Sequence, residues 1–132
     1  MENLPKAYKI GVIVLRTLLG ALFSFASLAY FFKLFPDPVF EGNIKVMMDG
    51  FDAAIYLLPI VKVLELLCGI SFLSGRLVTL SNIIIFPISV NILMIHVFHL
   101  PEGIPTAAFI FVTNCILFYA YRENYKSLLK VK

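Results

Sequence analysis

Residues 77–99 read LVTLSNIIIFPISVNILMIHVFH, a stretch that contains no Lys, Arg, Asp or Glu. At about 1.5 Å per residue, a helix of this length crosses a hydrocarbon layer of roughly 30 Å. In lipid the backbone has to satisfy its own hydrogen bonds, which favours a helix over a loop or an open strand. The stretch therefore predicts a membrane-spanning helix.

Three further stretches, of 23, 23 and 18 residues, are similarly apolar and close to the length that a span needs. Together the four predicted spans cover residues 10–32, 53–75, 77–99 and 104–121. The connections after the second and third spans are short, which makes consecutive helices antiparallel neighbours. The predicted fold is a single all-α domain over residues 1–132, a four-helix transmembrane bundle.

The composition excludes several other classes of protein. Apolar residues make up 61% of the chain and charged residues 14%, against roughly 45–50% and about 25% in ordinary globular proteins. A soluble domain of this size buries too little of its surface to hide so many apolar groups. The net charge of +3 and the two cysteines fit neither a nucleic-acid-binding protein nor a disulfide scaffold.

Positive charges outside the predicted spans are distributed unequally between the two sides of the membrane. One side holds Lys6, Lys9, Arg76, Arg122, Lys126, Lys130 and Lys132, and the other holds Lys33 and Lys45. Flanks rich in Lys and Arg stay in the cytoplasm. Both chain ends are therefore predicted to be cytoplasmic.

The connection between the first two helices, residues 33–52, is too apolar for a solvated linker. Its apolar residues Ile44, Met47, Met48 and Phe51 are spaced as on one face of a short helix, opposite Lys45, Asp49 and Asp52. This pattern predicts a short amphipathic segment that rests on the bundle or on the outer leaflet. The two glycines of the segment leave a flexible loop as the alternative.

Polar side chains inside the spans are costly in lipid, so they are the candidate functional residues. Counted from the cytoplasmic boundary, one residue from each helix falls into a common polar layer: Arg16, Glu65, Asn82 and Asn114. Arg16 and Glu65 are predicted to form an ion pair. This pair is either a structural lock between two helices or part of a pocket for a quinone, a proton or a small anion.

Lys62, Asn91 and His96 lie deeper and form a second candidate group. They suggest a path for a proton or a small solute that runs from His96 past Lys62 to Glu65. His96 and His99 lie close to Glu102 in sequence, a weak pattern that fits interfacial caps better than a metal site. No metal site is assigned.

Cys68 and Cys115 fall at similar depths in the second and fourth helices. A redox pair is one interpretation. Apolar filler is the other, and the absence of a Cys-x-x-Cys motif favours it.

Two motifs resemble a known family. The first helix contains VLRTLLGALF, and the second contains KVLELLCGISFL followed by SGRLVTLS. An Arg-x-x-x-Gly motif, a Glu-x-x-x-Gly motif and a short Gly/Arg hairpin resemble the DoxX family of small four-helix membrane proteins. The matching positions are Arg16, Gly20, Lys33, Glu65, Gly69 and Arg76, and Pro87, Asn91 and His96 are similar to the bacterial DoxX-like subset.

The resemblance implies a location in the bacterial cytoplasmic membrane and an accessory or quinone-associated role in a membrane redox system. Relatives in the DoxX family include a subunit of a membrane thiosulfate:quinone oxidoreductase. Besides the lipid bilayer, the expected partner is a redox subunit or a second copy, and quinone is the candidate cofactor. A small-solute or proton carrier and a non-catalytic assembly factor are the alternatives, and no catalytic residue is assigned.

Overall fold

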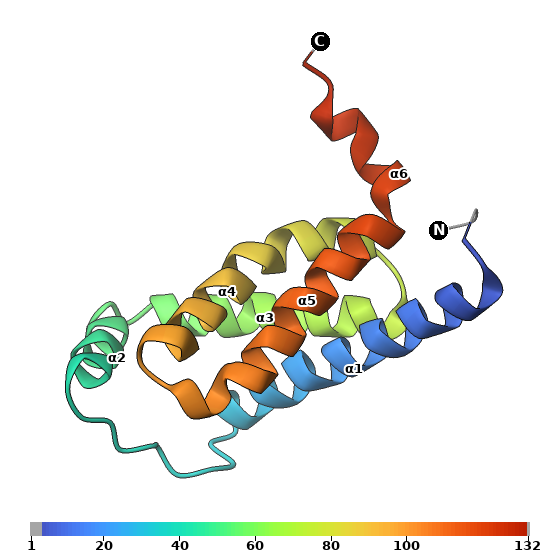
Figure 1. Cartoon of the computed structure of the whole chain (residues 1–132). Helices are drawn as coiled ribbons and strands as arrows, with labels where there is room; N and C mark the ends of the chain where they lie inside the picture. The colour runs from blue at the N-terminus through green and yellow to red at the C-terminus, as the bar shows by residue number, and fades with distance from the viewer. Residues whose placement is uncertain (1–3, 132) are drawn as a thin grey trace.

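The protein is a bundle of four long helices (Figure 1). The computed structural model describes residues 4–131. Lys132, which is counted among the cytoplasmic basic residues, lies outside the described residues. The long helices are α1 (Lys6–Phe31), α3 (Leu57–Ser74), α4 (Val78–Phe98) and α5 (Ile104–Ala120). Two predicted boundaries differ from the structure by four residues: α1 begins at Lys6, directly after Pro5, and not at residue 10, and α3 begins at Leu57 and not at residue 53.

All four long helices are long and apolar enough to cross a membrane. The described part of the chain contains no strand. The predicted all-α, four-helix bundle is confirmed, and the chain is a multi-pass membrane protein.

The helices pack in a ring in chain order. α1 makes its most extensive contact with α3, α3 packs on α4, α4 packs on α5, and α5 returns to α1. The turn between α3 and α4 passes through Gly75, whose φ of 76° lies in the left-handed region that glycine adopts without strain. The short helix η1 (Pro101–Gly103) joins α4 to α5.

The two ends of the bundle differ. Figure 1 shows α2 (Asn43–Ala53) at one end, which we name the α2 end. The opposite end, named the terminal end, holds the α3–α4 turn, the start of α1 and the chain that follows α5. That chain forms α6 (Arg122–Tyr125) and η2 (Lys126–Leu129).

The predicted amphipathic segment exists as α2. Ile44 is buried against the rest of the protein, and Met47 is half-buried. Lys45 and Asp49 are exposed and form a salt bridge of 2.6 Å along the helix. α2 contacts α3, so the flexible-loop alternative is wrong for residues 43–53, whereas residues 33–42 form an irregular and mostly exposed connection.

Candidate functional site

The contact between α1 and α3 sets the heights of the polar residues on these two helices. Gly20 of α1 lies directly against Gly69 and Leu73 of α3. Because the helices are antiparallel, residues before Gly20 lie toward the terminal end, and residues before Gly69 lie toward the α2 end. Arg16 and Glu65 therefore lie on opposite sides of this contact, about 12 Å apart along the bundle axis.

The predicted Arg16–Glu65 ion pair is wrong, because this separation places each side chain beside another partner. The Glu65 carboxylate lies 3.0 Å from the Lys62 ammonium, one turn away on the same helix. The Lys62 ammonium also lies 5.9 Å from the centre of the Tyr30 ring. Because the Glu65 side chain is only 5% exposed, its charge needs a close counter-charge in the protein interior.

Arg16 extends toward the terminal end. Its guanidinium donates a hydrogen bond of 3.2 Å to the Tyr121 hydroxyl. It also lies against Gly75, the C-cap of α3, where a Cβ would stand 3.1 Å from a guanidinium nitrogen. A cation at this place stabilises the negative end of the helix dipole, and long basic side chains in a membrane extend toward the nearer surface.

Of the four residues in the predicted polar layer, only Asn82 and Asn114 are bonded to each other. Both side chains are fully buried. The Asn114 amide donates to the Asn82 side-chain oxygen at 2.7 Å, and the Asn82 amide donates to the Asn114 backbone oxygen at 3.2 Å. The pair links α4 to α5, so the four predicted residues form three separate interactions and not one layer.

The residues of the second predicted path are not brought together. His96 is half-buried, and its Nδ1 hydrogen-bonds the Ile92 carbonyl oxygen of its own helix at 2.7 Å. Asn91 lies on the exposed face of α4, whereas Lys62 is paired with Glu65. Within residues 4–131 no three His, Cys, Asp or Glu side chains are grouped so that they could hold a metal ion.

The two cysteines are unpaired and lie in different surroundings. Cys68 is buried, with its sulfur 3.6 Å from the Ser81 carbonyl oxygen, and Cys115 is exposed. Buried cysteine often serves as a small apolar side chain. The structure therefore does not contain the redox pair that their similar depth suggested.

The remaining family-pattern positions lie at the helix ends. Lys33 is exposed just beyond α1 and has a positive φ of 50°. Arg76 is exposed in the α3–α4 turn, and its carbonyl oxygen accepts a hydrogen bond from the Ser71 hydroxyl. Their roles in the structure are to end one helix and to form one turn.

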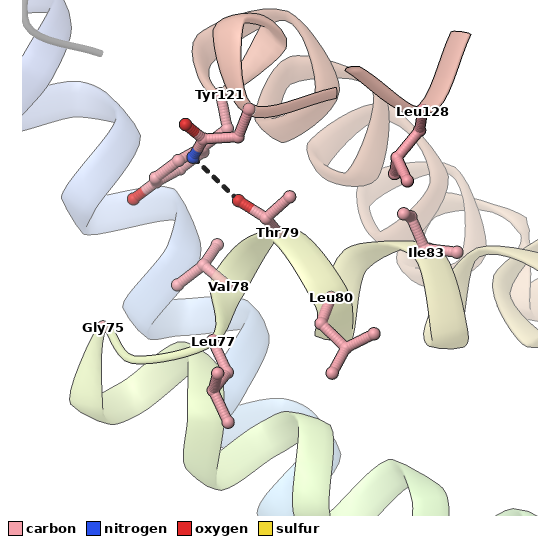
Figure 2. Close-up of a pocket in the computed structure, with 9 residues that line it drawn as sticks. Gly75, Leu77, Val78, Thr79, Leu80, Ile83, Tyr121 and Leu128 are labelled. Atoms are coloured by element: carbon pink, nitrogen blue, oxygen red, sulfur yellow. Dashed lines mark hydrogen bonds between the residues drawn. The ribbon is translucent and has the colours of Figure 1, made fainter. Parts of the chain in front are cut away.

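A groove of about 430 Å³ opens at the terminal end, between the start of α4 and the chain after α5. Figure 2 shows its lining. The polar side chains are Thr79, Tyr121 and Asn124, and the larger apolar ones are Leu77, Leu80, Ile83 and Leu128. Arg16 contacts both Tyr121 and Gly75, so a cation borders one end of this groove.

Hydrogen bonds hold the chain after α5 against α4. The Asn124 amide donates to the Thr79 hydroxyl at 2.9 Å, the bond drawn in Figure 2. The Tyr125 hydroxyl donates to the Thr79 carbonyl oxygen at 2.9 Å, and burial raises the pKa of Tyr125. On the exposed side of α6, the hydrogen bond from Lys126 lowers the pKa of Glu123.

The groove residues were not among the candidates chosen from the sequence. Tyr121 and Tyr125 have the positions of interfacial aromatic residues, and nothing in the order of residues indicates that Tyr125 reaches Thr79. Thr79 lies in a stretch that the sequence marks only as apolar. A contact between residues 46 positions apart depends on the turn of the chain after α5.

No family model, curated protein or solved structure matches this chain. The similarity to the DoxX family remains a prediction that rests on the motif residues.

Proposed function

We propose that this protein is a non-catalytic, DoxX-like component of a bacterial membrane redox system that holds a quinone in the groove at the terminal end. The redox assignment rests on the motifs around Arg16 and Glu65. The observation that carries the binding site is the groove itself, which combines hydrogen-bonding groups with an apolar wall.

The chemistry of the groove suits a quinone. A quinone ring carries carbonyl oxygens that accept hydrogen bonds, and its isoprenoid tail is apolar. The Thr79 and Tyr121 hydroxyls each accept a hydrogen bond, and neither donates its own proton to another described residue. Both protons are therefore available for a carbonyl oxygen, while Leu80, Ile83 and Leu128 offer apolar surface to the tail.

The interactions inside the bundle support an accessory role over a catalytic one or a carrier. Lys62 pairs with Glu65, Asn82 pairs with Asn114, and Arg16 is bonded to Tyr121. The Asn82–Asn114 and Arg16–Tyr121 pairs link different helices, and the Lys62–Glu65 pair lies within α3. None of them connects Lys62, Asn91 and His96 into a path. We place both chain ends in the cytoplasm because of the excess of Lys and Arg at the terminal end.

The binding site is tested by purifying the full chain in mild detergent and analysing an organic extract for quinones by mass spectrometry. Binding of a short-chain ubiquinone analogue is then measured by equilibrium dialysis. Tyr121→Phe and Thr79→Val should each raise the dissociation constant about tenfold, the equivalent of one lost hydrogen bond. Tyr119→Phe is the control, because the Tyr119 ring packs on Tyr8 away from the groove.

Equal affinity in the wild type and in both groove variants would contradict the proposed site. Proton or solute flux in vesicles that contain the purified protein would favour a carrier instead. The orientation is tested with a cysteine at Val131, which is 97% exposed. That cysteine should be protected from a membrane-impermeant reagent in intact cells, and labelling from outside would reverse the proposed orientation.

A further inference from the structure

Asn91 is a polar side chain that the bundle leaves on its outer surface. It lies about 20 Å from the start of α4 and about 10 Å from its end, which is within the apolar thickness of a membrane. Its side chain is exposed and forms no hydrogen bond with any described residue. The other two asparagines inside the spans, Asn82 and Asn114, are fully buried and bonded to each other.

An unpaired amide in this place is unfavourable. Lipid tails offer the amide no hydrogen bond, so an amide that faces lipid remains an unsatisfied polar group in hydrocarbon. Asparagine side chains in membrane helices form hydrogen bonds across helix–helix contacts. The exposure of Asn91 in the single chain therefore points to another helix that covers it.

The residues around Asn91 form a regular surface. Ile84, Pro87, Asn91, Met94 and Phe98 follow one another at spacings of three, four, three and four, and all are exposed. We name these five residues the α4 seam. The buried residues of α4, which include Ile85 and Ser89, lie on the opposite face. This is the spacing with which helices pack along a shared axis, and one asparagine in such an apolar repeat fixes its register.

We infer that two copies of this chain associate along the α4 seam, with the two Asn91 side chains hydrogen-bonded to each other. A carboxamide both donates and accepts, so it is its own complement across a twofold axis. Two copies in the same membrane orientation bring each seam residue opposite its own counterpart. α4 contains no Lys, Arg, Asp or Glu, so two identical seams meet without charge repulsion.

The dimer is tested with the full chain in liposomes, with single-molecule photobleaching to count subunits as the protein is diluted in lipid. Asn91→Leu should weaken association about tenfold, and Asn91→Gln, which keeps the amide, should retain most of it. Both substitutions lie on the exposed surface, so the thermal unfolding of the single chain should stay unchanged. Val112→Leu, on an exposed face of α5, is the matched control and should leave association unaltered.

Cross-linking locates the contact. In a background with Cys68→Ala and Cys115→Ala, a cysteine at Met94 should form an intermolecular disulfide, and one at Val112 should not. A monomer at all lipid ratios, undiminished association of Asn91→Leu, or equal cross-linking at the two positions would each overturn the inference. Association that needs a second, different protein would overturn it as well.

Discussion

Gly20 and Gly69 are in direct backbone contact where α1 crosses α3. A Cβ on Gly20 would stand 2.7 Å from the Gly69 carbonyl oxygen, and a Cβ on Gly69 would stand 3.0 Å from the Gly20 carbonyl oxygen. Neither position has room for a larger residue unless a backbone moves. Membrane helices use small residues for such close approach, and this contact fixes how far α1 and α3 slide along each other.

Gly20→Ala should lower the free energy of unfolding by about 1–3 kcal/mol, because the new methyl group meets backbone atoms that cannot turn away. Reversible unfolding in mixed micelles, followed by circular dichroism, measures the loss. Gly11→Ala is the control, since no atom lies within 4 Å of a Cβ at Gly11. Alanine there should leave stability unchanged or raise it by up to about 1 kcal/mol. A Gly20→Ala protein as stable as the wild type would mean that the helices are not in contact here.

The pairing of charges predicts which double variants show coupling. Lys62→Met and Glu65→Gln should be coupled by about 0.5–3 kcal/mol, because the two groups form one ion pair. Arg16→Met and Glu65→Gln should be additive within about 0.5 kcal/mol, since these side chains lie on opposite sides of the Gly20–Gly69 contact. Unfolding free energies of the single and double variants provide both values. Strong coupling between Arg16 and Glu65 would contradict this separation and support the ion pair that the sequence predicts.

The amphipathic packing of α2 predicts a contrast in cysteine reactivity. In a chain with Cys68→Ala and Cys115→Ala, a cysteine at Ile44 should react slowly with a polar thiol reagent, and one at Met47 at an intermediate rate. Cysteines at Val46 and Asp49 should react fast. The reason for the contrast is exposure, because Ile44 is 7% exposed whereas Val46 is 70% exposed. Rates that are equal along residues 44–49 would indicate that α2 does not pack on the bundle.

The raised pKa of Tyr125 predicts how the chain after α5 responds to alkali. Because burial favours the neutral phenol in the folded protein, its contribution to stability is complete below the ordinary pKa of about 10. The contribution is lost as the pH rises through the higher pKa of the folded state. The difference in absorbance at 295 nm between the wild type and Tyr125→Phe should therefore show a phenol that ionises above pH 10.

The same residue has a measurable effect on stability. Tyr125→Phe removes the hydrogen bond to the Thr79 carbonyl oxygen and should cost about 0.5–1.5 kcal/mol. Tyr56→Phe is the control, because Tyr56 is 65% exposed and should contribute nothing. If the Tyr125 phenol ionised at or below about pH 10, the packing of this residue against α4 would be contradicted.

The four spans could be predicted because the length and apolarity of a membrane helix are properties of one segment alone. The apolar face of α2 could be predicted for a similar reason, since Ile44 and Met47 repeat with the period of a helix. The proximity of Asn82 and Asn114 could also be predicted from the sequence, because both residues lie at similar depths on consecutive helices.

The depth of Arg16 in the membrane, counted along the sequence from the end of its apolar segment, wrongly predicted that Arg16 pairs with Glu65. The first turns of α1 lie beyond the Gly20–Gly69 contact on the side of the terminal end, so the Arg16 guanidinium lies beside Gly75 and not closer to the middle of the bundle. This offset depends on the shape of two facing helix surfaces, above all at Gly20 and Gly69. The groove could not be predicted from the sequence for a related reason. It forms only because the chain after α5 brings Tyr121 and Tyr125 back to the start of α4.

The unequal lengths of α1 and α3 have a consequence for the surrounding lipid. With 26 residues α1 is about 39 Å long, and with 18 residues α3 is about 27 Å long. A bilayer with a hydrocarbon thickness of roughly 30 Å is too thin for the first helix when upright and slightly too thick for the second. α1 must tilt or extend into the headgroup layer, whereas lipids beside α3 must compress. The protein should therefore be most stable in bilayers of short-chain lipids, and thicker, sterol-rich membranes should strain it on the α3 side.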